Sequence, residues 1–304
     1  MCRDGAGLWG GWSDWSGVAA VTEWACGVRR HAQWTVAEVG GGVQADFSQP
    51  EALRALLDVQ RPAQVVNAAA YTAVDRAESE PDVVFRINAQ APGVIAHWCA
   101  EHGVPLVHYS TDYVFDGRST SPYRVDAPVA PLSIYGSSKL AGERAVQAAG
   151  GCSLILRTAW VYAAHGHNFL RTMLRLGAAS ERLRVVADQI GTPTSAGLIA
   201  DVTAQLLAWG LQSRHAGIWH LTATGQTSWH GFAEEIFVQA QACGLIMRVP
   251  QVQAIASVGY PTAARRPAYS CLDTTALVET FGIVLPDWRQ GVRGVLDDIV
   301  NRSR

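Results

Sequence analysis

The sequence predicts an α/β fold built on a doubly wound parallel sheet, and three observations carry this prediction. From residue 50 onward, short strand-like runs alternate with segments of helix length. The strand-like runs are nearly continuous in apolar residues, as is typical of strands buried on both faces. The chain has 304 residues, of which 49% are hydrophobic and 16% charged, so it can bury the core of one large domain or two smaller ones.

The helices are predicted from helix-forming residues and from apolar spacing. In the first helix, Leu53, Leu56 and Leu57 share one side. The second contains Pro92 near its middle, where we expect a kink. In chain order the predicted helices span residues 50–60, 81–102, 134–149, 196–209, 229–242 and 288–300.

The predicted strands lie between these helices. They span residues 63–70, 104–110, 152–158, 183–187 and 217–221. Strands that alternate with helices of this length form βαβ units, with helices on both faces of the sheet. Ligands bind outside the carboxyl ends of the strands in such folds, so the ends of the second and third strands should face the chemistry. A loop rich in Pro, Ser and Thr, residues 119–133, precedes the third helix.

Composition excludes several classes of protein. A net charge of −2 gives no electrostatic reason to expect nucleic acid or an anionic membrane as partner. No run of 18 apolar residues and no signal-peptide pattern is present, so we expect a cytoplasmic protein. The six cysteines form no C-x-x-C pair, which favours free thiols in a reducing compartment. The nine histidines form no ligand cluster, so no metal site is predicted.

Lys139 is the only lysine in a sequence with 24 Lys and Arg residues, and it lies four positions after Tyr135. Positions i and i+4 of a helix share a face, so the phenol and the ammonium should point the same way. An exposed lysine on an arginine-biased surface is the structural alternative. A pair of this kind suits proton transfer, because a nearby ammonium lowers the pKa of a phenol that is ordinarily near 10.

A hydroxyl at the carboxyl end of the strand 104–110 completes a plausible carbonyl-reduction site. Thr111 would hydrogen-bond the ketone oxygen while Tyr135 protonates it, and Lys139 would also reach the cofactor ribose. The hydride must come from a cofactor, because no side chain can supply it. The structural alternative for Thr111 is a capping or turn residue.

These residues resemble the extended branch of the short-chain dehydrogenase/reductase superfamily, and more closely the dTDP-4-dehydrorhamnose reductase family. The resemblance runs in order from about Asp46 to the end of the chain. Its motifs are Val66–Glu78, His108–Gly117, Tyr135–Arg144, Arg157–Tyr162, Ala187–Thr194 and Tyr260–Pro267.

The resemblance implies a Rossmann-like dinucleotide-binding domain over residues 1–165. Residues 166–304 would be mainly substrate-binding, interleaved with late strands of the first domain. The implied reaction is reduction of the C4 ketone of dTDP-4-dehydro-L-rhamnose with NADPH or NADH, a step of dTDP-rhamnose biosynthesis. Some family members are Mg2+-dependent homodimers, and nothing in this sequence independently indicates a metal or a dimer.

Site residues follow from matching positions. The implied catalytic residues are Thr111, Tyr135 and Lys139. The implied cofactor contacts, besides Tyr135 and Lys139, are Asp46, Phe47, Ala69, Ala70, Tyr71, Thr72 and Tyr109, with Asp46 and Phe47 beside the adenine. The implied contacts to the sugar nucleotide are Thr111, Asp112, Trp160, Asn168 and Arg266. Trp160 could instead be a core aromatic and Arg266 a member of a surface ion pair, and Asp75 and Glu78 are expected to brace helices.

The first 45 residues depart from this pattern, so the first β-α unit is predicted to be atypical or missing. Residues 1–43 contain five tryptophans, one leucine and no isoleucine. The G-x-G-x-x-G match at Gly5–Gly10 has only four residues before it, too few for the strand that such a turn requires. A shifted reading frame or a wrong start is our hypothesis for this segment. The residue that selects NADH or NADPH should lie here, so that preference cannot be read.

Two other functions remain open at this point. One is a different nucleotide-sugar enzyme of the extended branch, such as an epimerase or a dehydratase. The other is a non-catalytic binding protein that resembles the regulatory subunit of methionine adenosyltransferase.

Overall fold

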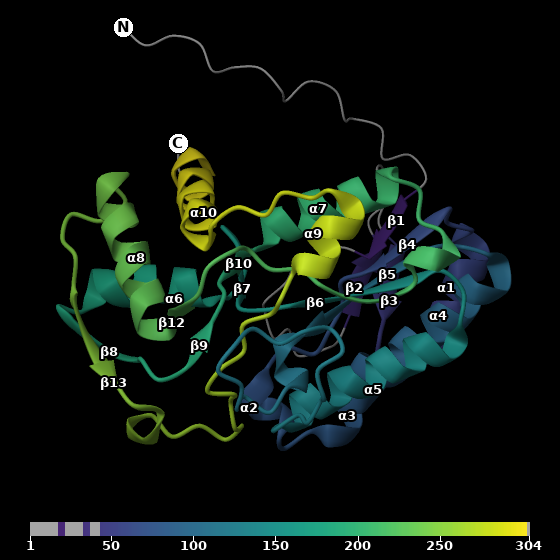
Figure 1. The fold of residues 1–304 in the computed structure, drawn as a ribbon, viewed down its shortest axis with the longest axis horizontal. Helices are drawn as coiled ribbons and strands as arrows, with labels where there is room; N and C mark the ends of the chain where they lie inside the picture. The colour runs from purple at the N-terminus through teal and green to yellow at the C-terminus, as the bar shows by residue number, and fades with distance from the viewer. Residues whose placement is uncertain (1–17, 22–32, 37–42, 303–304) are drawn as a thin grey trace, which may run out of the picture.

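The computed structural model describes residues 18–21, 33–36 and 43–302 of the chain. Its centre is a five-stranded parallel sheet (Figure 1). In spatial order the strands are β1 (Val18–Val21), β4 (Gln64–Asn67), β5 (Leu106–Thr111), β6 (Ser153–Thr158) and β11 (Gly217–His220). All four contacts between neighbouring strands are parallel, as the alternation of strands and helices predicts.

Helices cover both faces of this sheet, which confirms the doubly wound fold. Val65, Leu106 and Ile155 pack in one apolar cluster with α1 (Pro50–Gln60), α4 (Ala91–His102) and α5 (Ile134–Ala149). Their neighbours Val66, Val107 and Leu154 pack in another cluster with α7 (Ala196–Ala208) and α9 (Thr275–Phe281). Successive residues of a strand face opposite sides, so each strand supplies both layers. In Figure 1, α5 lies below the sheet and α7 and α9 above it.

The predicted helix over residues 81–102 is three segments joined end to end. It comprises α3 (Pro81–Phe85), a π-helical turn η1 (Arg86–Gln90) and α4. Pro92 has no N–H, so the Asn88 carbonyl four residues earlier lacks its α-helical donor. That carbonyl lies against Gly142 of α5, where a Cβ would stand 2.1 Å from the oxygen. The proline therefore changes the helix type locally.

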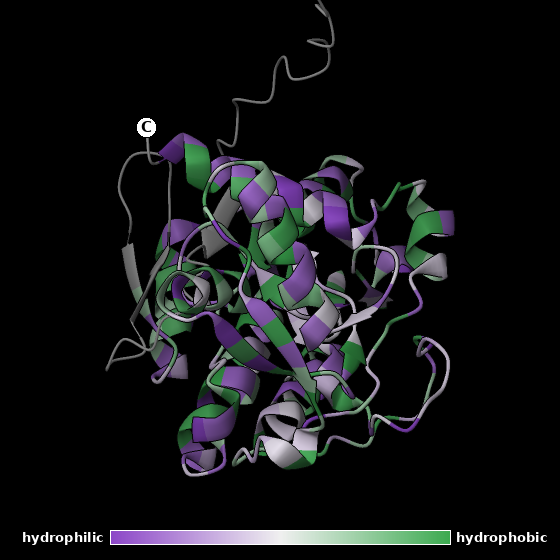
Figure 2. Ribbon diagram, turned by 90° about the vertical axis from the view of Figure 1, so that its left-hand side faces the viewer, coloured by the Kyte–Doolittle hydropathy of each residue, from purple (hydrophilic) through white to green (hydrophobic). Residues whose placement is uncertain are grey.

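A second group of elements gathers around its own core at the other end of the molecule (Figure 1). It contains α6 (Phe169–Ala179), α8 (Trp229–Ala242) and α10 (Trp288–Arg302), beside a parallel pair of strands, β8 (Arg182–Val186) and β13 (Gln251–Ile255). The helices of the molecule alternate hydrophobic and hydrophilic segments, as expected when one side of each is buried (Figure 2). α7, β11 and α9 return to the central sheet, and the division into interleaved domains stays a prediction. A boundary at residue 165 stays a prediction.

Short elements connect these layers. They are α2 (Val74–Ala77), η2 (Asp112–Val114), β7 (Val161–Tyr162), β9 (Ile190–Gly191), β10 (Thr194–Ser195), η3 (Ser213–His215), β12 (Thr227–Ser228) and η4 (Ser257–Gly259). Within the described part of the chain, no helix is both long and apolar enough to cross a bilayer.

The atypical amino-terminal segment contributes three described strands. β1 runs parallel to β4 and lies at one edge of the central sheet. β2 (Gln33–Val36) pairs with β3 (Val43–Asp46) in antiparallel orientation. The Gly5–Gly10 match lies outside the described residues.

Candidate active site

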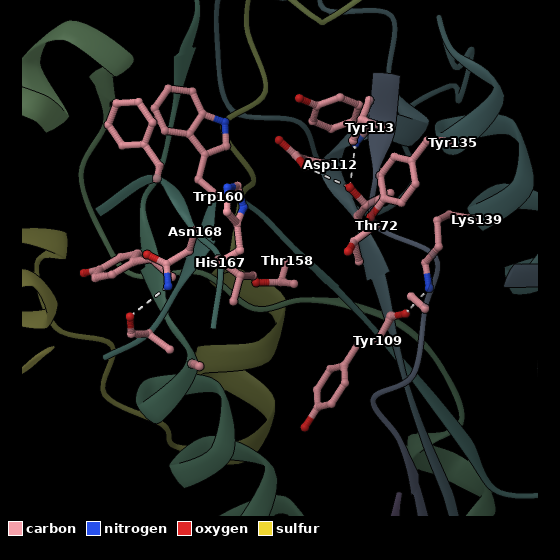
Figure 3. Close-up of a pocket in the computed structure, with 18 of the residues that line it drawn as sticks. Thr72, Tyr109, Asp112, Tyr113, Tyr135, Lys139, Thr158, Trp160, His167 and Asn168 are labelled. Atoms are coloured by element: carbon pink, nitrogen blue, oxygen red, sulfur yellow. Dashed lines mark hydrogen bonds between the residues drawn. The ribbon is translucent and has the colours of Figure 1, made fainter. Parts of the chain in front are cut away.

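A cavity of about 580 Å³ opens at the carboxyl ends of the central strands, where the fold predicts the site. In Figure 3, Tyr135, Lys139, Asp112 and Tyr113 stand on one side and Trp160, His167 and Asn168 on the other. The cavity therefore lies between the sheet with its α5 layer and the aromatic residues of the second group of elements.

Tyr135 and Lys139 project from the same part of α5 and both line the cavity. Ser133 caps the start of the helix, and its hydroxyl accepts a hydrogen bond of 3.1 Å from Gly136 N. Gly136 lets α5 pack closely, because a Cβ there would stand 2.3 Å from the Tyr113 carbonyl oxygen. The Tyr135 ring meets the Tyr113 ring edge to face at 5.6 Å. The expectation that phenol and ammonium share one helix face is confirmed.

Lys139 is 2% exposed, and its Nζ donates a hydrogen bond of 2.6 Å to the Tyr109 carbonyl oxygen. Burial lowers the pKa of Lys139 to about 8, opposed by the negative charge of Glu143. The side chain is therefore still mainly an ammonium at neutral pH. The pKa of the nearby His108 is lowered mainly by burial and further by the Lys139 ammonium, so the His108 imidazole is neutral.

Glu143 lies one turn beyond Lys139 on α5 and forms a buried ion pair with Arg157 of β6. Arg157 Nε and Nη2 donate hydrogen bonds of 2.8 and 2.7 Å to the two carboxylate oxygens. Ser110 Oγ donates a third, of 2.6 Å. The pairing of Glu143 with Arg157 was not predicted from the sequence, although the four-residue spacing from Lys139 places Glu143 on the same face of α5.

Thr111 is the last residue of β5 and caps η2. Its Oγ1 accepts a hydrogen bond of 3.2 Å from Tyr113 N and donates one of 3.0 Å to Asp112 Oδ1. Asp112 is 2% exposed, and its Oδ2 has no hydrogen-bond partner among the described residues. Burial raises the pKa of Asp112 to about 7, opposed by hydrogen bonds from Ser270 and Thr111. Both side chains line the cavity, and Thr111 also has the capping role considered as its alternative.

Thr158 is a cavity residue that the sequence analysis missed. It ends β6 and is the register partner of Thr111 on β5. Its side chain is 6% exposed, and the hydroxyl finds no hydrogen-bond partner among the described residues. Figure 3 shows it between the two sides of the cavity. The end of the predicted strand at residue 158 was a signal that could have identified it.

Trp160 forms an aromatic wall with two residues of the second group of elements. Its ring stacks on Trp229 at 3.5 Å between centroids and 3° between planes, and Phe169 packs against Trp229 at 4.7 Å. The backbone of Trp160 is left-handed, with φ of 49°. Gly191 makes room for the indole, because a Cβ there would lie 2.4 Å from the ring. All three aromatic side chains line the cavity.

The segment after β4 lines the cavity with small side chains, at Ala69, Ala70 and Thr72. Tyr71 points elsewhere, since its hydroxyl donates a hydrogen bond of 2.7 Å to Glu80. Asn88 of η1 holds the backbone of this segment, accepting from Tyr71 N at 2.8 Å and donating to Tyr71 O at 3.1 Å. Tyr109, the remaining inferred cofactor contact here, also lines the cavity.

Asp46 and Phe47 lie outside the cavity lining. The Asp46 carboxylate accepts from Ser48 N at 2.8 Å and from Ser48 Oγ at 2.6 Å, and Phe47 is fully buried in the core. Their place beside an adenine remains a prediction from the resemblance.

Asn168 and Arg266 both line the cavity but are engaged with protein groups. Asn168 caps α6 and donates to the Ala163 and His165 carbonyl oxygens at 2.9 and 3.1 Å. The two Nη atoms of Arg266 donate to the Asp75 carboxylate at 3.0 and 2.6 Å. Asp75 also accepts from Ala264 N, so it holds this loop at the cavity. Ligand contacts by Asn168 and Arg266 stay predictions.

Among the residues the structure describes, no three His, Cys, Asp or Glu side chains are grouped so as to hold a metal ion.

Comparisons with known proteins place this arrangement in a family. The protein-family model described as "RmlD substrate binding domain" matches residues 22–301 of this chain. A dTDP-4-dehydrorhamnose reductase of Burkholderia thailandensis is 47% identical over 266 residues, covering 85% of this chain and 89% of the relative. The protein of the same name from Escherichia coli K12 is 44% identical over 255 residues, covering 84% and 85%.

Solved structures agree. A dTDP-4-dehydrorhamnose reductase from Clostridium acetobutylicum matches with a TM-score of 0.77 and 35% identity, covering 84% of this chain and 87% of that one. The enzyme of the same name from Bacillus anthracis, solved in complex with NADP, also matches with a TM-score of 0.77. Its identity is 34%, and the match covers 83% of this chain and 86% of that one. The chain therefore belongs to the RmlD, or dTDP-4-dehydrorhamnose reductase, family.

Proposed function

We propose that this chain reduces the C4 ketone of dTDP-4-dehydro-L-rhamnose to dTDP-L-rhamnose with NADPH or NADH. The observation that carries the proposal is the convergence of Tyr135, Lys139 and Thr111 on one cavity at the carboxyl ends of the strands. Curated relatives at 44–47% identity over most of the chain bear the name of this reductase.

The residues divide the work of a carbonyl reduction. Tyr135 delivers a proton to the ketone oxygen, so that the product is an alcohol. Lys139 is fixed by the Tyr109 carbonyl and keeps a positive charge beside the site, which favours the phenolate left behind. Thr111 binds the same oxygen. A nicotinamide cofactor, when bound in this cavity, would supply the hydride that the ketone carbon requires.

The residues present fit such a cofactor. Ala69 and Ala70 form a wall with small side chains, so a large flat group can approach the strand end closely. Lys139 offers an ammonium for ribose hydroxyls, and Thr158 offers a buried hydroxyl with no hydrogen-bond partner among the described residues. The related structure from Bacillus anthracis holds NADP.

The opposite side of the cavity suits a sugar nucleotide. Trp160 and Trp229 present aromatic surface to a sugar or a base, as aromatic side chains commonly do in binding sites. Arg266 offers a planar fork for phosphate oxygens. Among the described residues that line the cavity, it is the only arginine.

The test is an NADPH-oxidation assay with dTDP-4-dehydro-L-rhamnose, followed by identification of the product. Stoichiometric formation of dTDP-L-rhamnose supports the proposal. A chain that binds NADPH, as followed by its fluorescence, but oxidises none of it would be the non-catalytic binding protein. An epimerised or dehydrated product would indicate the other extended-branch activities.

A further inference from the structure

The Thr111 hydroxyl has its single proton committed to another side chain. A hydroxyl has one proton and two lone pairs to share. Thr111 Oγ1 gives the proton to Asp112 Oδ1 at 3.0 Å and uses one lone pair for Tyr113 N at 3.2 Å. One lone pair is left, and a ketone oxygen has no proton to offer it. In this arrangement Thr111 cannot donate a hydrogen bond to a substrate ketone.

We propose that the protonation state of Asp112 decides which way the Thr111 proton points. When Asp112 is ionised, its Oδ1 accepts from Thr111. When Asp112 carries a proton on Oδ1, the same bond reverses: Asp112 donates to the free lone pair of Thr111 Oγ1. The Thr111 proton is then released toward the cavity and can be given to the ketone oxygen. Asp112 is thus a positioning residue that acts through Thr111, and the inference rests on the proposed reduction.

The surroundings of Asp112 permit both states. Its side chain is nearly fully buried, and Oδ2 has no hydrogen-bond partner among the described residues. The groups that face it are Thr111 of β5, Tyr113 of η2, and Ser270 and Cys271 of the C-terminal loop. Burial raises the pKa of Tyr113, with the Asp112 charge adding to it, and likewise that of Cys271. Both are therefore neutral near pH 7, and none of these four groups offers a positive charge that would fix the carboxylate.

The direction of the pH effect follows. Burial raises the pKa of Asp112 to about 7, so the protonated form predominates below that pH. We expect kcat/KM to fall as pH rises through about 7, because this parameter reports groups of the free enzyme.

The experiment compares pH profiles of kcat/KM for the wild type, Asp112→Asn, Thr111→Val and the double variant. An asparagine amide can donate permanently to Thr111, so the fall near pH 7 should disappear in Asp112→Asn. Between about pH 6 and about pH 8.5, its kcat/KM relative to wild type should then rise on the order of 30-fold. In the Thr111→Val background there is no proton to redirect, and Asp112→Asn should leave the shape of the profile unchanged. Asp126→Asn removes an exposed carboxylate and is the matched control, with the wild-type profile.

Superimposable profiles for wild type and Asp112→Asn would overturn the proposal. If Asp112→Asn does not fold, the Thr111→Val profile is the test. A fall of kcat/KM near pH 7 that persists in Thr111→Val would contradict the switch. Infrared spectra of the resting protein provide a readout that needs no turnover. A carboxylic-acid band that titrates near pH 7, shifts in Thr111→Val and is lost in Asp112→Asn supports the switch, and its absence at about pH 6 refutes it. An absence of ketosugar turnover at every pH would instead refute the proposed function.

Discussion

Lys139 Nζ donates a hydrogen bond of 2.6 Å to the backbone carbonyl of Tyr109. This bond ties the end of β5 to α5 and fixes the ammonium at the wall of the cavity, one helical turn from Tyr135. The position has an energetic cost, because burial disfavours the charged form of Lys139 and lowers its pKa to about 8. The site therefore keeps a positive charge on Lys139 although its burial destabilises the folded protein.

This cost predicts a pH-dependent difference in stability between the wild type and Lys139→Met. An unfolded lysine titrates near 10.4, whereas folded Lys139 titrates near 8. Between these values the unfolded chain binds more protons than the folded one, so wild-type stability rises with pH. Relative to Lys139→Met, the wild type should gain about 2 kcal/mol between pH 7 and pH 9.5.

Urea unfolding of both proteins at the two pH values measures this difference in the free energy of unfolding. The contributions of the other titrating groups are shared by the two proteins and cancel. A difference that does not change with pH would show that Lys139 is not charged and buried as described. Activity provides the contrast: Lys139→Met should lose about 100-fold or more in kcat.

Thr158 should contribute to ligand contacts and not to folding. A buried hydroxyl without a partner destabilises, so Thr158→Val should leave the free energy of unfolding unchanged or raise it by up to about 1 kcal/mol. If the hydroxyl binds cofactor or substrate, the same variant should lose about tenfold in kcat/KM, while Thr158→Ser retains most of it. Equal activity of the valine and serine variants would exclude such a contact.

Arg266 should act on substrate affinity. We expect Arg266→Ala to raise KM for the dTDP-sugar about 10-fold to 100-fold with a smaller change in kcat, because a charged hydrogen bond contributes about 1.5–3 kcal/mol. Arg124→Ala is the matched control, since Arg124 forms an exposed pair with Asp126. An unchanged KM in Arg266→Ala would show that Arg266 does not bind the substrate and that its role is limited to the ion pair with Asp75.

Removal of one partner from the buried ion pair of Glu143 and Arg157 should destabilise the fold strongly. Arg157→Met would leave Glu143 as an unpaired charge beneath the site, at a cost of about 3–5 kcal/mol. The double variant Glu143→Gln/Arg157→Met should recover much of this loss. Arg54→Met, which breaks the exposed pair with Glu101, should cost far less stability, because water screens an exposed pair. Chemical denaturation of the four proteins compares these effects, and equal losses for the two arginines would contradict the burial described here.

Local sequence signals predicted much of the fold. The helices 134–149 and 229–242 match α5 and α8 at both ends, and each begins after a serine whose hydroxyl accepts a backbone N–H. The π-helical turn at residues 86–90 was not foreseen, because it depends on how Pro92 and the packing against Gly142 change one hydrogen bond. The helices α6 and α9 and the strand β13 were also missed.

The candidate site was predicted where its residues are close in sequence. Tyr135 and Lys139 share a helix, and Thr111 ends a strand, so spacing alone placed them. The contribution of Thr158 depends on the register between β5 and β6, and the pairing of Asp75 with Arg266 joins residues 191 positions apart. The end of the predicted strand marks Thr158 itself, but neither its pairing with Thr111 nor the pairing of Asp75 with Arg266 is encoded in local spacing. Tyr71 was expected at the cofactor, yet its hydroxyl is bound to Glu80.

The most direct test of the account is a single-turnover measurement of NADPH oxidation by Tyr135→Phe with the dTDP-4-ketosugar. The phenyl ring preserves the packing against Tyr113 and removes the proton donor. We predict that the variant still folds and binds NADPH, and that the rate of oxidation is reduced by about 100-fold or more. Oxidation at the wild-type rate would contradict the role of Tyr135 as the proton donor.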